Sequence, residues 1–413
     1  MRPARPEIVS MVLAGGMGKR LLPLTRDRAK PAVPFGGHYR LIDFALSNLV
    51  NGGYRKIVVL TQYLSDSLNR HLALTWRMST LLGNYVTSVP AQMRMGERWF
   101  LGSADAILQN LNILHDERPE HVFVFGADHI YRMDPSQMLA QHIETGAGVT
   151  VAAIRRPIEE APELGVIERG DGTEISAFLE KPKTAKPLPD DPSMVFASMG
   201  NYVFETEFLY DIVSADAEAD GSKHDIGGDL IPRAVSMGQA HVYDFADNDV
   251  PGSLERDRAY WRDVGSVDAY HDAHLDLVEP EPVFNLYNSA WPIYTASVTA
   301  PPAKVVADKG ISGEIVNSIL SNGVIVSGGS VKRSIVSPGV RVDGGATVEE
   351  SIVLHGVKVG PGATVRRAIV DKNVMIPEGA EVGVDPERDA ARFHVSESGV
   401  VVIGKGDVIS EPR

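Results

Sequence analysis

Short apolar runs without a polar face recur along the first two thirds of the chain, separated by stretches with helical spacing. The runs are residues 8–13, 57–61, 122–126 and 149–154. The helical stretches are residues 43–51, 104–115 and 135–145, and Ser103 and Asp134 are the predicted N-caps of the last two. β-Branched runs that are apolar on both faces are typical of parallel strands covered by helices. The pattern predicts an α/β domain of the Rossmann-like, doubly wound kind, with ligands at the carboxyl ends of its strands.

The pattern changes past Ile311, where a short sequence motif is repeated. Its isoleucines are 16, 17 and 17 residues apart, at Ile319, Ile335, Ile352 and Ile369. Three hexapeptides make about one coil of a parallel β-helix, so the chain is expected to end in such a helix. Prolines at 280–282 and 301–302 bracket a stretch of little pattern. We therefore predict an α/β domain at residues 1–285, a linker at 286–310 and a β-helix at 311–413.

Composition narrows the partners and the compartment. The chain has 40 basic and 54 acidic residues, a formal net charge of −14, so nucleic acid and anionic membrane surfaces are not expected as partners. It has no cysteine, which excludes disulfides and thiolate metal sites and fits a reducing cytoplasm. The run at 8–13 is too short for a signal peptide, and no segment approaches the length of a membrane span. A cytoplasmic protein is expected.

The first apolar run ends in a glycine loop that predicts a cradle for a nucleoside triphosphate. Such a loop brings bare backbone N–H groups up to phosphates, and two cations follow it. The loop and its cations are Leu13, Ala14, Gly15, Gly16, Gly18, Arg20 and Lys30. A Walker A loop is excluded because Leu13 and Arg20 stand where Gly and Ser or Thr are required. A dinucleotide loop is excluded because Leu21 stands in place of its third glycine.

Three longer motifs surround this loop. They are Ala14-Gly-Gly-Met-Gly-Lys-Arg-Leu21, Arg28-Ala-Lys-Pro-Ala-Val-Pro34 and Asp43-Phe-Ala-Leu-Ser-Asn48. Together they resemble bacterial glucose-1-phosphate adenylyltransferases, also called ADP-glucose pyrophosphorylases, and the resemblance extends over nearly the whole chain. It implies a GT-A type nucleotidyltransferase domain followed by a left-handed β-helix of hexapeptide repeats. It also implies adenylyl transfer from ATP to glucose 1-phosphate, in bacterial glycogen or related α-glucan synthesis.

The resemblance also implies the roles of single residues. In-line attack on the α-phosphorus needs positioned cations and Mg²⁺, and the implied catalytic residues are Arg20, Lys30 and Asp128. Asp128 and Asp263 match the family's metal-binding aspartates, although each could instead cap a helix; His129 is expected to be structural. The nucleotide contacts implied beyond the loop are Gln92 and Gly102. The implied sugar-phosphate contacts are Phe100, Gly165, Glu180, Lys181, Ser198, Tyr202 and Asp225.

Regulation and assembly are further implications of the resemblance. Members of the family bind phosphorylated sugars or AMP between two domains, and many are homotetramers. The basic groups assigned to effector binding are Arg28, His38, Arg40 and Arg392. Arg28 and Arg40 could equally form surface ion pairs. Asp27 replaces a lysine of enteric-type members, so little activation by fructose 1,6-bisphosphate is expected.

Three alternatives stay open at this level. The same fold could transfer uridylyl or thymidylyl groups, because base choice follows from neither charge nor periodicity. The β-helix could transfer acyl groups, for which His355 is the only histidine in the clear repeats. The chain could be a noncatalytic regulatory subunit, which is disfavoured because all the implied catalytic, phosphate-binding and metal-binding side chains occur together.

Overall fold

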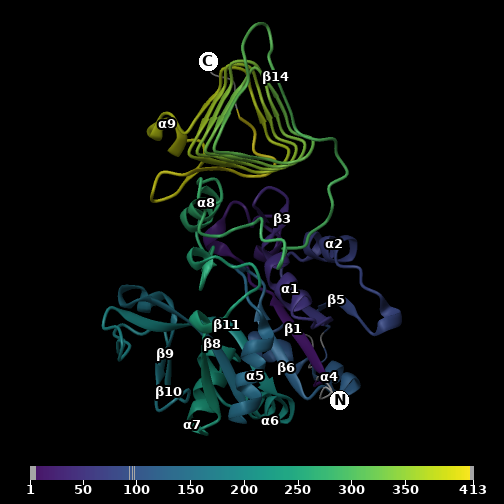
Figure 1. Ribbon diagram of the computed structural model, residues 1–413, viewed down its shortest axis with the longest axis vertical. Coiled ribbons are helices and arrows are strands. Elements are labelled where there is room, and N and C mark those ends of the chain that lie inside the picture. The colour runs from purple at the N-terminus through teal and green to yellow at the C-terminus, as the bar shows by residue number, and fades with distance from the viewer. Residues whose placement is uncertain (1–5, 93, 95, 97, 410–413) are drawn as a thin grey trace.

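The computed structural model describes residues 6–92, 94, 96 and 98–409, which form two bodies stacked end to end (Figure 1). The lower body in that view is an α/β domain, and the upper one is a triangular prism of coils. None of the described helices is long and apolar enough to cross a bilayer.

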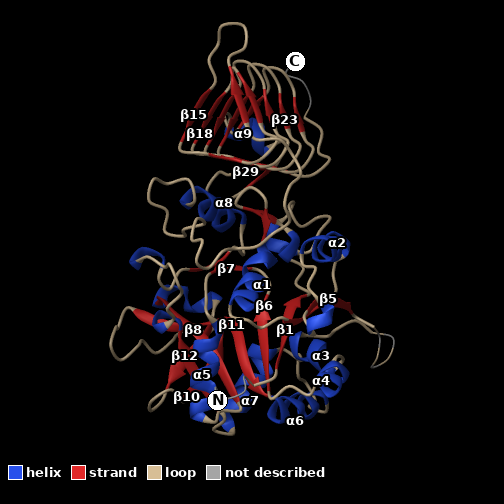
Figure 2. Ribbon diagram, turned by 45° about the vertical axis from the view of Figure 1, so that its right-hand side comes forward, coloured by secondary structure: helices blue, strands red, loops and turns tan. Residues whose placement is uncertain are grey.

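A nine-stranded sheet runs through the α/β domain (Figure 2). Its main path is β10-β9-β11-β6-β1-β4-β5, with β8 paired to β11 and β12 to β8. The strands are β1 Ile8–Ala14, β4 Lys56–Thr61, β5 Tyr85–Pro90, β6 His121–Gly126, β8 Val149–Pro157, β9 Gly165–Arg169, β10 Ile175–Glu180, β11 Met194–Glu205 and β12 Ala240–Asp244. β1 lies parallel to β4 and β6, as predicted, but β11 is antiparallel to both β6 and β8. The run at 149–154 is therefore a strand that lies outside the continuous parallel set.

The sheet is buried on both faces. Met11 and Val12, neighbours in β1, belong to separate hydrophobic clusters, as expected because successive side chains of a strand point to opposite faces. The helices of this body are α1 Leu41–Asn51, α2 Asp66–Thr75, α3 Ser103–Leu108, α4 Leu111–Glu117, α5 Pro135–Thr145, α6 Thr206–Ala217, α7 Ile231–Ser236 and α8 Val267–Asp276. Two small sheets complete it, β2 Pro34–Phe35 with β3 Tyr39–Arg40, and β7 His129–Tyr131 with β13 Trp261–Asp263.

The predicted helix ends are partly right. Asp134 caps α5, since its Oδ1 accepts a hydrogen bond from Ser136 N at 2.9 Å. The helix predicted at 104–115 is instead two helices, because Asn110 leaves helical geometry between them. Gly102, not Ser103, is the N-cap of α3. The Ser103 hydroxyl does not cap the helix, and it donates instead to Asp225 at 3.0 Å.

The prism is a parallel β-helix of three sheets. Their strands are β14 Lys304–Val306, β17 Ile325–Ser327, β20 Arg341–Val342, β23 Lys358–Val359 and β26 Met375–Ile376; β15 Glu314–Val316, β18 Ser330–Lys332, β21 Thr347–Glu349, β24 Thr364–Arg366 and β27 Glu381–Val382; and β16 Ile319–Leu320, β19 Ile335–Val336, β22 Ile352–Val353, β25 Ala368–Val370, β29 Val401–Ile403 and β28 His394–Val395. A short helix, α9, spans Pro386–Ala390. The predicted alignment is confirmed, because the repeat isoleucines pair from coil to coil. β14 begins inside the segment expected to be a linker, and the three-part division stays a prediction.

The Ile-Val pairs of the repeat divide between two cores. Val353 and its equivalents fill the interior of the prism. Ile352 and its equivalents point the other way, into a cluster with Phe35, Phe44 and Tyr270 of the α/β domain. One face of the prism is therefore buried against its own chain, and this contact holds the two bodies together.

Candidate active site

A cavity of about 760 Å³ lies at the carboxyl ends of β1, β4 and β6. Gly15 and Gly16 follow β1, Gln62 follows β4 and Asp128 follows β6, and all four line the cavity. Parallel strands bring their carboxyl ends to one edge of the sheet, which is why residues far apart in sequence meet here. The cavity lies where the strand pattern predicts a ligand.

The glycine loop packs tightly against the segment that carries Lys30. Gly18 has φ +62°, and a Cβ there would lie 2.9 Å from the Lys30 Cβ and 3.0 Å from Thr25 Cγ2. Both the left-handed backbone and the close approach therefore require glycine at this position. The Thr25 hydroxyl donates to the Gly18 carbonyl at 2.8 Å and closes the loop. Gly16 has nothing within 4 Å of its virtual Cβ, so its backbone borders open space.

Lys30 lies between the two aspartates that were predicted to bind metal. Its Nζ is 2.9 Å from Asp128 Oδ2 and 2.7 Å from Asp263 Oδ1. β13 brings Asp263 there, because it pairs antiparallel with β7 and sets Asp263 opposite His129. The Arg20 guanidinium is far more exposed than the Lys30 ammonium, and it lies 3.9 Å from Asp263 and 3.7 Å from Glu163.

Burial and charge act against each other on these groups. Burial by itself would lower the pKa of Lys30, but the Asp128 and Asp263 carboxylates outweigh it and raise that pKa. Burial by itself would raise the pKa of Asp128, but Lys30, aided by His129, holds that pKa well below its usual range. Lys30 and Asp128 are therefore both charged at neutral pH.

The donor set fits a divalent ion. Ligand atoms of Asp128, His129 and Asp263 all lie within 4.8 Å of one another, and they are the one such group among the described residues. Carboxylate oxygens suit Mg²⁺, whereas an imidazole does not. The Lys30 ammonium already lies between the two carboxylates, which shows that the geometry accepts a cation there.

The opposite wall carries the residues predicted to contact the sugar phosphate. All seven line the cavity together with Gly102. Lys181, with φ +49°, has an exposed side chain 3.6 Å from Glu180. Gly102 must be glycine, because a Cβ would lie 2.2 Å from the His224 carbonyl oxygen. Burial raises the pKa of the Tyr202 hydroxyl, so it stays protonated and can donate.

Not every predicted residue lies in this cavity. Ala14 and Lys30 are buried, and neither they nor Gly18 and Arg20 are among the described lining residues. Gln92 is exposed, accepts from Arg94 at 2.9 Å and is absent from the described lining, so its contact with the base stays a prediction. Sequence reasoning missed Gln62, whose Oε1 accepts from Phe100 N at 2.7 Å, although its place just after an apolar strand was a usable signal.

A second pocket, of about 170 Å³, lies between the two bodies. His38, Arg40, His355 and Lys372 line it, and its described lining contains no carboxylate. Burial, followed by the charges of Arg40 and Arg28, lowers the pKa of Lys372 to about 8. Burial also lowers the pKa values of His38 and His355. Lys372 was missed by sequence reasoning, where a lysine in a repeat looks like any solvated charge.

Two of the four predicted effector residues lie elsewhere. Arg28 is not among the described residues that line the second pocket. It is buried, and its guanidinium forms a bidentate ion pair with the Asp371 carboxylate, with Nη2 2.8 Å from Oδ2. The alternative of a surface ion pair is therefore wrong for Arg28. Arg392 lies beside α9, where it binds Asp389 at 2.9 Å. It is not among the described residues that line the pocket. Its basic character alone could not show where the coil would place it.

Fold and cavity together define a nucleotidyltransferase. The family model described as nucleotidyl transferase matches residues 9–279, and the model described as GlmU-like C-terminal hexapeptide matches residues 301–403. Nucleotidyltransferases of this kind generally use a divalent metal ion.

The relatives narrow this class. The glucose-1-phosphate adenylyltransferase of Acidothermus cellulolyticus is 61% identical over 412 residues, covering 98% of this chain and 99% of that protein. Proteins of the same name from Parafrankia sp. and Streptomyces coelicolor are 60% and 62% identical over 410 and 400 residues, covering 98% and 97% of this chain and 99% of each relative. The chain belongs to the glucose-1-phosphate adenylyltransferase family, which confirms the family and the fold class expected from its motifs.

Proposed function

We propose that this chain transfers the adenylyl group of ATP to α-D-glucose 1-phosphate, giving ADP-glucose and pyrophosphate. Its relatives carry the name of that activity. The observation that carries the proposal is the meeting of Lys30, Asp128 and Asp263 beside the glycine loop. The reaction would be the first committed step of bacterial glycogen or α-glucan synthesis.

The residues of the cavity suit a direct displacement. A phosphate oxygen of glucose 1-phosphate attacks the α-phosphorus, a new P–O bond forms, and the bond to pyrophosphate breaks in line with it. The N–H groups of Gly15 and Gly16 bind the triphosphate, and Arg20 offsets its charge. Lys30, which is paired with two carboxylates here, is placed to exchange them for a phosphate group.

The opposite wall would hold the second substrate. Lys181 is the cation placed to bind the phosphate of glucose 1-phosphate, and Asp225 offers an acceptor for a sugar hydroxyl. Ser103 orients Asp225 by donating to it at 3.0 Å. Phe100 cannot donate a hydrogen bond to either ligand, so this position contributes shape alone.

Mg²⁺ is the proposed ion, held by Asp128 and Asp263. It would neutralise charge on the phosphates while the substrates react. Hard carboxylate oxygens with few protein ligands match its preference.

The second pocket is the proposed site for phosphorylated-sugar or AMP-type effectors. Arg40, Lys372 and His38 supply positive and hydrogen-bonding groups without a neighbouring carboxylate in the described lining. A cytoplasmic homotetramer completes the proposal, and light scattering of the purified chain would test the assembly.

Pyrophosphate release with ATP, UTP and dTTP, each with glucose 1-phosphate, tests the activity. We expect ATP to be preferred by about 100-fold, a difference of about 3 kcal/mol. Faster turnover of UTP or dTTP would instead assign uridylyl or thymidylyl transfer. No turnover at all would leave a regulatory subunit, and consumption of acetyl-CoA would point to the β-helix as an acyltransferase.

A further inference from the structure

Asp263 is joined to α8 by a short, tightly packed connection. Val264 is fully buried, and a Cβ on Gly265 would lie 2.7 Å from Asp263 Oδ2 and 2.9 Å from an Arg20 nitrogen. α8 begins at Val267, with Ser266 as its N-cap. Because so little chain separates the carboxylate from the helix, a movement of α8 moves Asp263.

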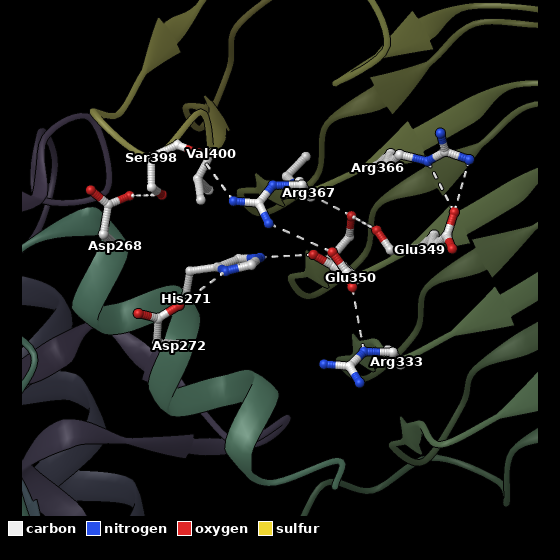
Figure 3. Close-up of polar contacts among 12 residues, drawn as sticks. Asp268, His271, Asp272, Arg333, Glu349, Glu350, Arg366, Arg367, Ser398 and Val400 are labelled. Atoms are coloured by element: carbon white, nitrogen blue, oxygen red, sulfur yellow. Dashed lines mark hydrogen bonds and ion pairs between the residues drawn. The ribbon is translucent and has the colours of Figure 1, made fainter.

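The β-helix binds α8 through two polar side chains on one face of that helix (Figure 3). Asp268 Oδ1 accepts hydrogen bonds from the hydroxyls of Ser396 and Ser398, the latter at 2.7 Å. One turn further on, His271 Nε2 lies 2.7 Å from the carbonyl oxygen of Glu350. A carbonyl can only accept, so the ring donates from Nε2.

The corner of the prism that receives His271 is unlike the other two corners. Its residues Arg333, Glu350 and Arg367 have φ of 45°, 46° and 43°, a region that is costly for any residue with a side chain. Most equivalent positions at the other corners hold glycine, as at Gly339 and Gly362; Asn373, with φ 61°, is the exception in one coil. A strained backbone kept without glycine is a reason to look for a role at this corner.

At this corner, the backbone carbonyl of Glu350 is hydrogen-bonded to the α/β domain and not to the described residues of a neighbouring coil. The coil-to-coil bonds there run from Glu350 N to Lys332 O and from Arg367 N to Glu349 O, each at 3.0 Å. Among the described residues, the Glu350 carbonyl is bound by His271 instead. The coil therefore presents an acceptor whose partner lies on α8.

Lys30, the ion-pair partner of Asp263, is also linked to the β-helix. Arg28, two residues before Lys30, makes its buried pair with Asp371 of the adjoining coil. Both ends of the Lys30–Asp263 contact are thus bound to the β-helix through nearby residues.

We infer that Asp268 and His271 are positioning residues, through which the β-helix holds Asp263 at the distance from Lys30 and Asp128 that a shared cation requires. The inference rests on the proposed role of Asp263 as a metal ligand. Partners that orient a metal ligand without touching the ion commonly alter metal affinity when they are removed.

Mn²⁺ binding to the full-length protein without substrates, followed by electron paramagnetic resonance, tests this apart from activity. His271→Ala and the double variant Ser396→Ala/Ser398→Ala should each weaken Mn²⁺ binding about tenfold. The KM for Mg²⁺ should rise in parallel, while the KM for glucose 1-phosphate changes less than about twofold. His271→Gln should recover most of the affinity, because its amide can donate to the same carbonyl.

Glu397→Gln is the matched control, since Glu397 is exposed and lies between Ser396 and Ser398 in the same loop. Asp263→Asn separates the inference from the function on which it rests. If Asp263→Asn binds Mn²⁺ as the unaltered protein does, the metal role of Asp263 is wrong. If Asp263→Asn loses binding but the double serine variant keeps it, the positioning role is wrong and the proposed function stands. The serine variant leaves α8 intact, so it decides the question even if His271→Ala fails to fold.

Discussion

Arg28 and Lys30 are two residues apart, yet their ion pairs belong to regions of different character. Lys30 binds aspartates whose side chains are 30% and 33% exposed, on the wall of an open cavity. The side chains of Arg28 and Asp371 are 5% and 1% exposed, sealed between the two bodies. A pair that water and ligands reach can exchange partners at small cost, whereas opening a sealed pair leaves a charge unpaired in a low dielectric. The accessible Lys30 pairs therefore suit a site that binds ligands, and the buried Arg28–Asp371 pair suits a structural contact between the two bodies.

The comparison predicts that the two regions respond differently to substitution. Changes in the cavity should alter rate with little effect on folding. Changes at the interface should alter stability first, and activity only as a consequence.

Asp128→Asn should give the largest effect. Loss of this carboxylate removes charge that acts on the reacting phosphates, so kcat should fall about 1000-fold, or about 4 kcal/mol. Circular dichroism and thermal unfolding should stay close to those of the unaltered protein. Asp116→Asn, at an exposed position on α4, is the control. An unchanged kcat for Asp128→Asn would rule out its metal role.

Asp371→Ala should destabilise the protein by about 3 kcal/mol, because Arg28 then stays buried without a partner. Urea unfolding measures this loss. The double variant Arg28→Met/Asp371→Leu replaces both charges with apolar groups, and it should recover most of the stability. If the single variant lost no more than the double, the interface would not depend on this pair.

Lys181→Gln should raise the KM for glucose 1-phosphate about tenfold, the loss of one charge-assisted contact worth about 1.4 kcal/mol. The KM for ATP should stay the same. Lys183→Gln, on the same exposed turn, should change neither constant. A rise in the KM for ATP instead would reverse the assignment of the two walls.

Anion binding in the second pocket should weaken as the pH rises. The pKa of Lys372 is about 8, so its ammonium is mostly present at pH 7 and mostly lost at pH 9. Sulfate, which does not titrate in this range, should bind about fivefold more weakly at pH 9, a change of about 1 kcal/mol. Calorimetry measures it. Lys372→Arg keeps its charge and should show a flat profile; an equal slope in both proteins would contradict the role of Lys372.

Glu350→Gly should have the smallest effect. Glycine adopts the φ of 46° at this corner without strain, which offsets the loss of the exposed ion pairs to Arg333 and Arg367. Stability should change by less than about 1 kcal/mol in urea unfolding. The backbone carbonyl that binds His271 is kept. A large loss would show that the side chains, and not the backbone, hold this corner.

Some of the cavity could be predicted from local pattern alone. A strand that ends in Gly15 and Gly16 places backbone N–H groups at a sheet edge, and Asp128 follows another strand of the same kind. Asp263 was different, since only the family motif pointed to it. Its place depends on β13 pairing with β7, more than a hundred residues earlier in the chain. Ser103 shows the limit most clearly, because a serine before a helix suggests a cap, whereas its hydroxyl binds Asp225, 122 residues later in the chain.

The sequence by itself determined four of the nine strands of the large sheet, the glycine turn and the coil-to-coil alignment of the β-helix. These follow from local steric preferences and from the period of burial along one segment. Only the tertiary structure decided that the repeat isoleucines cover the α/β domain, that Arg28 is sealed against Asp371 and that α8 is bound by the prism. Such contacts join distant segments, and their free energy depends on how the whole chain packs, which no short window of sequence contains.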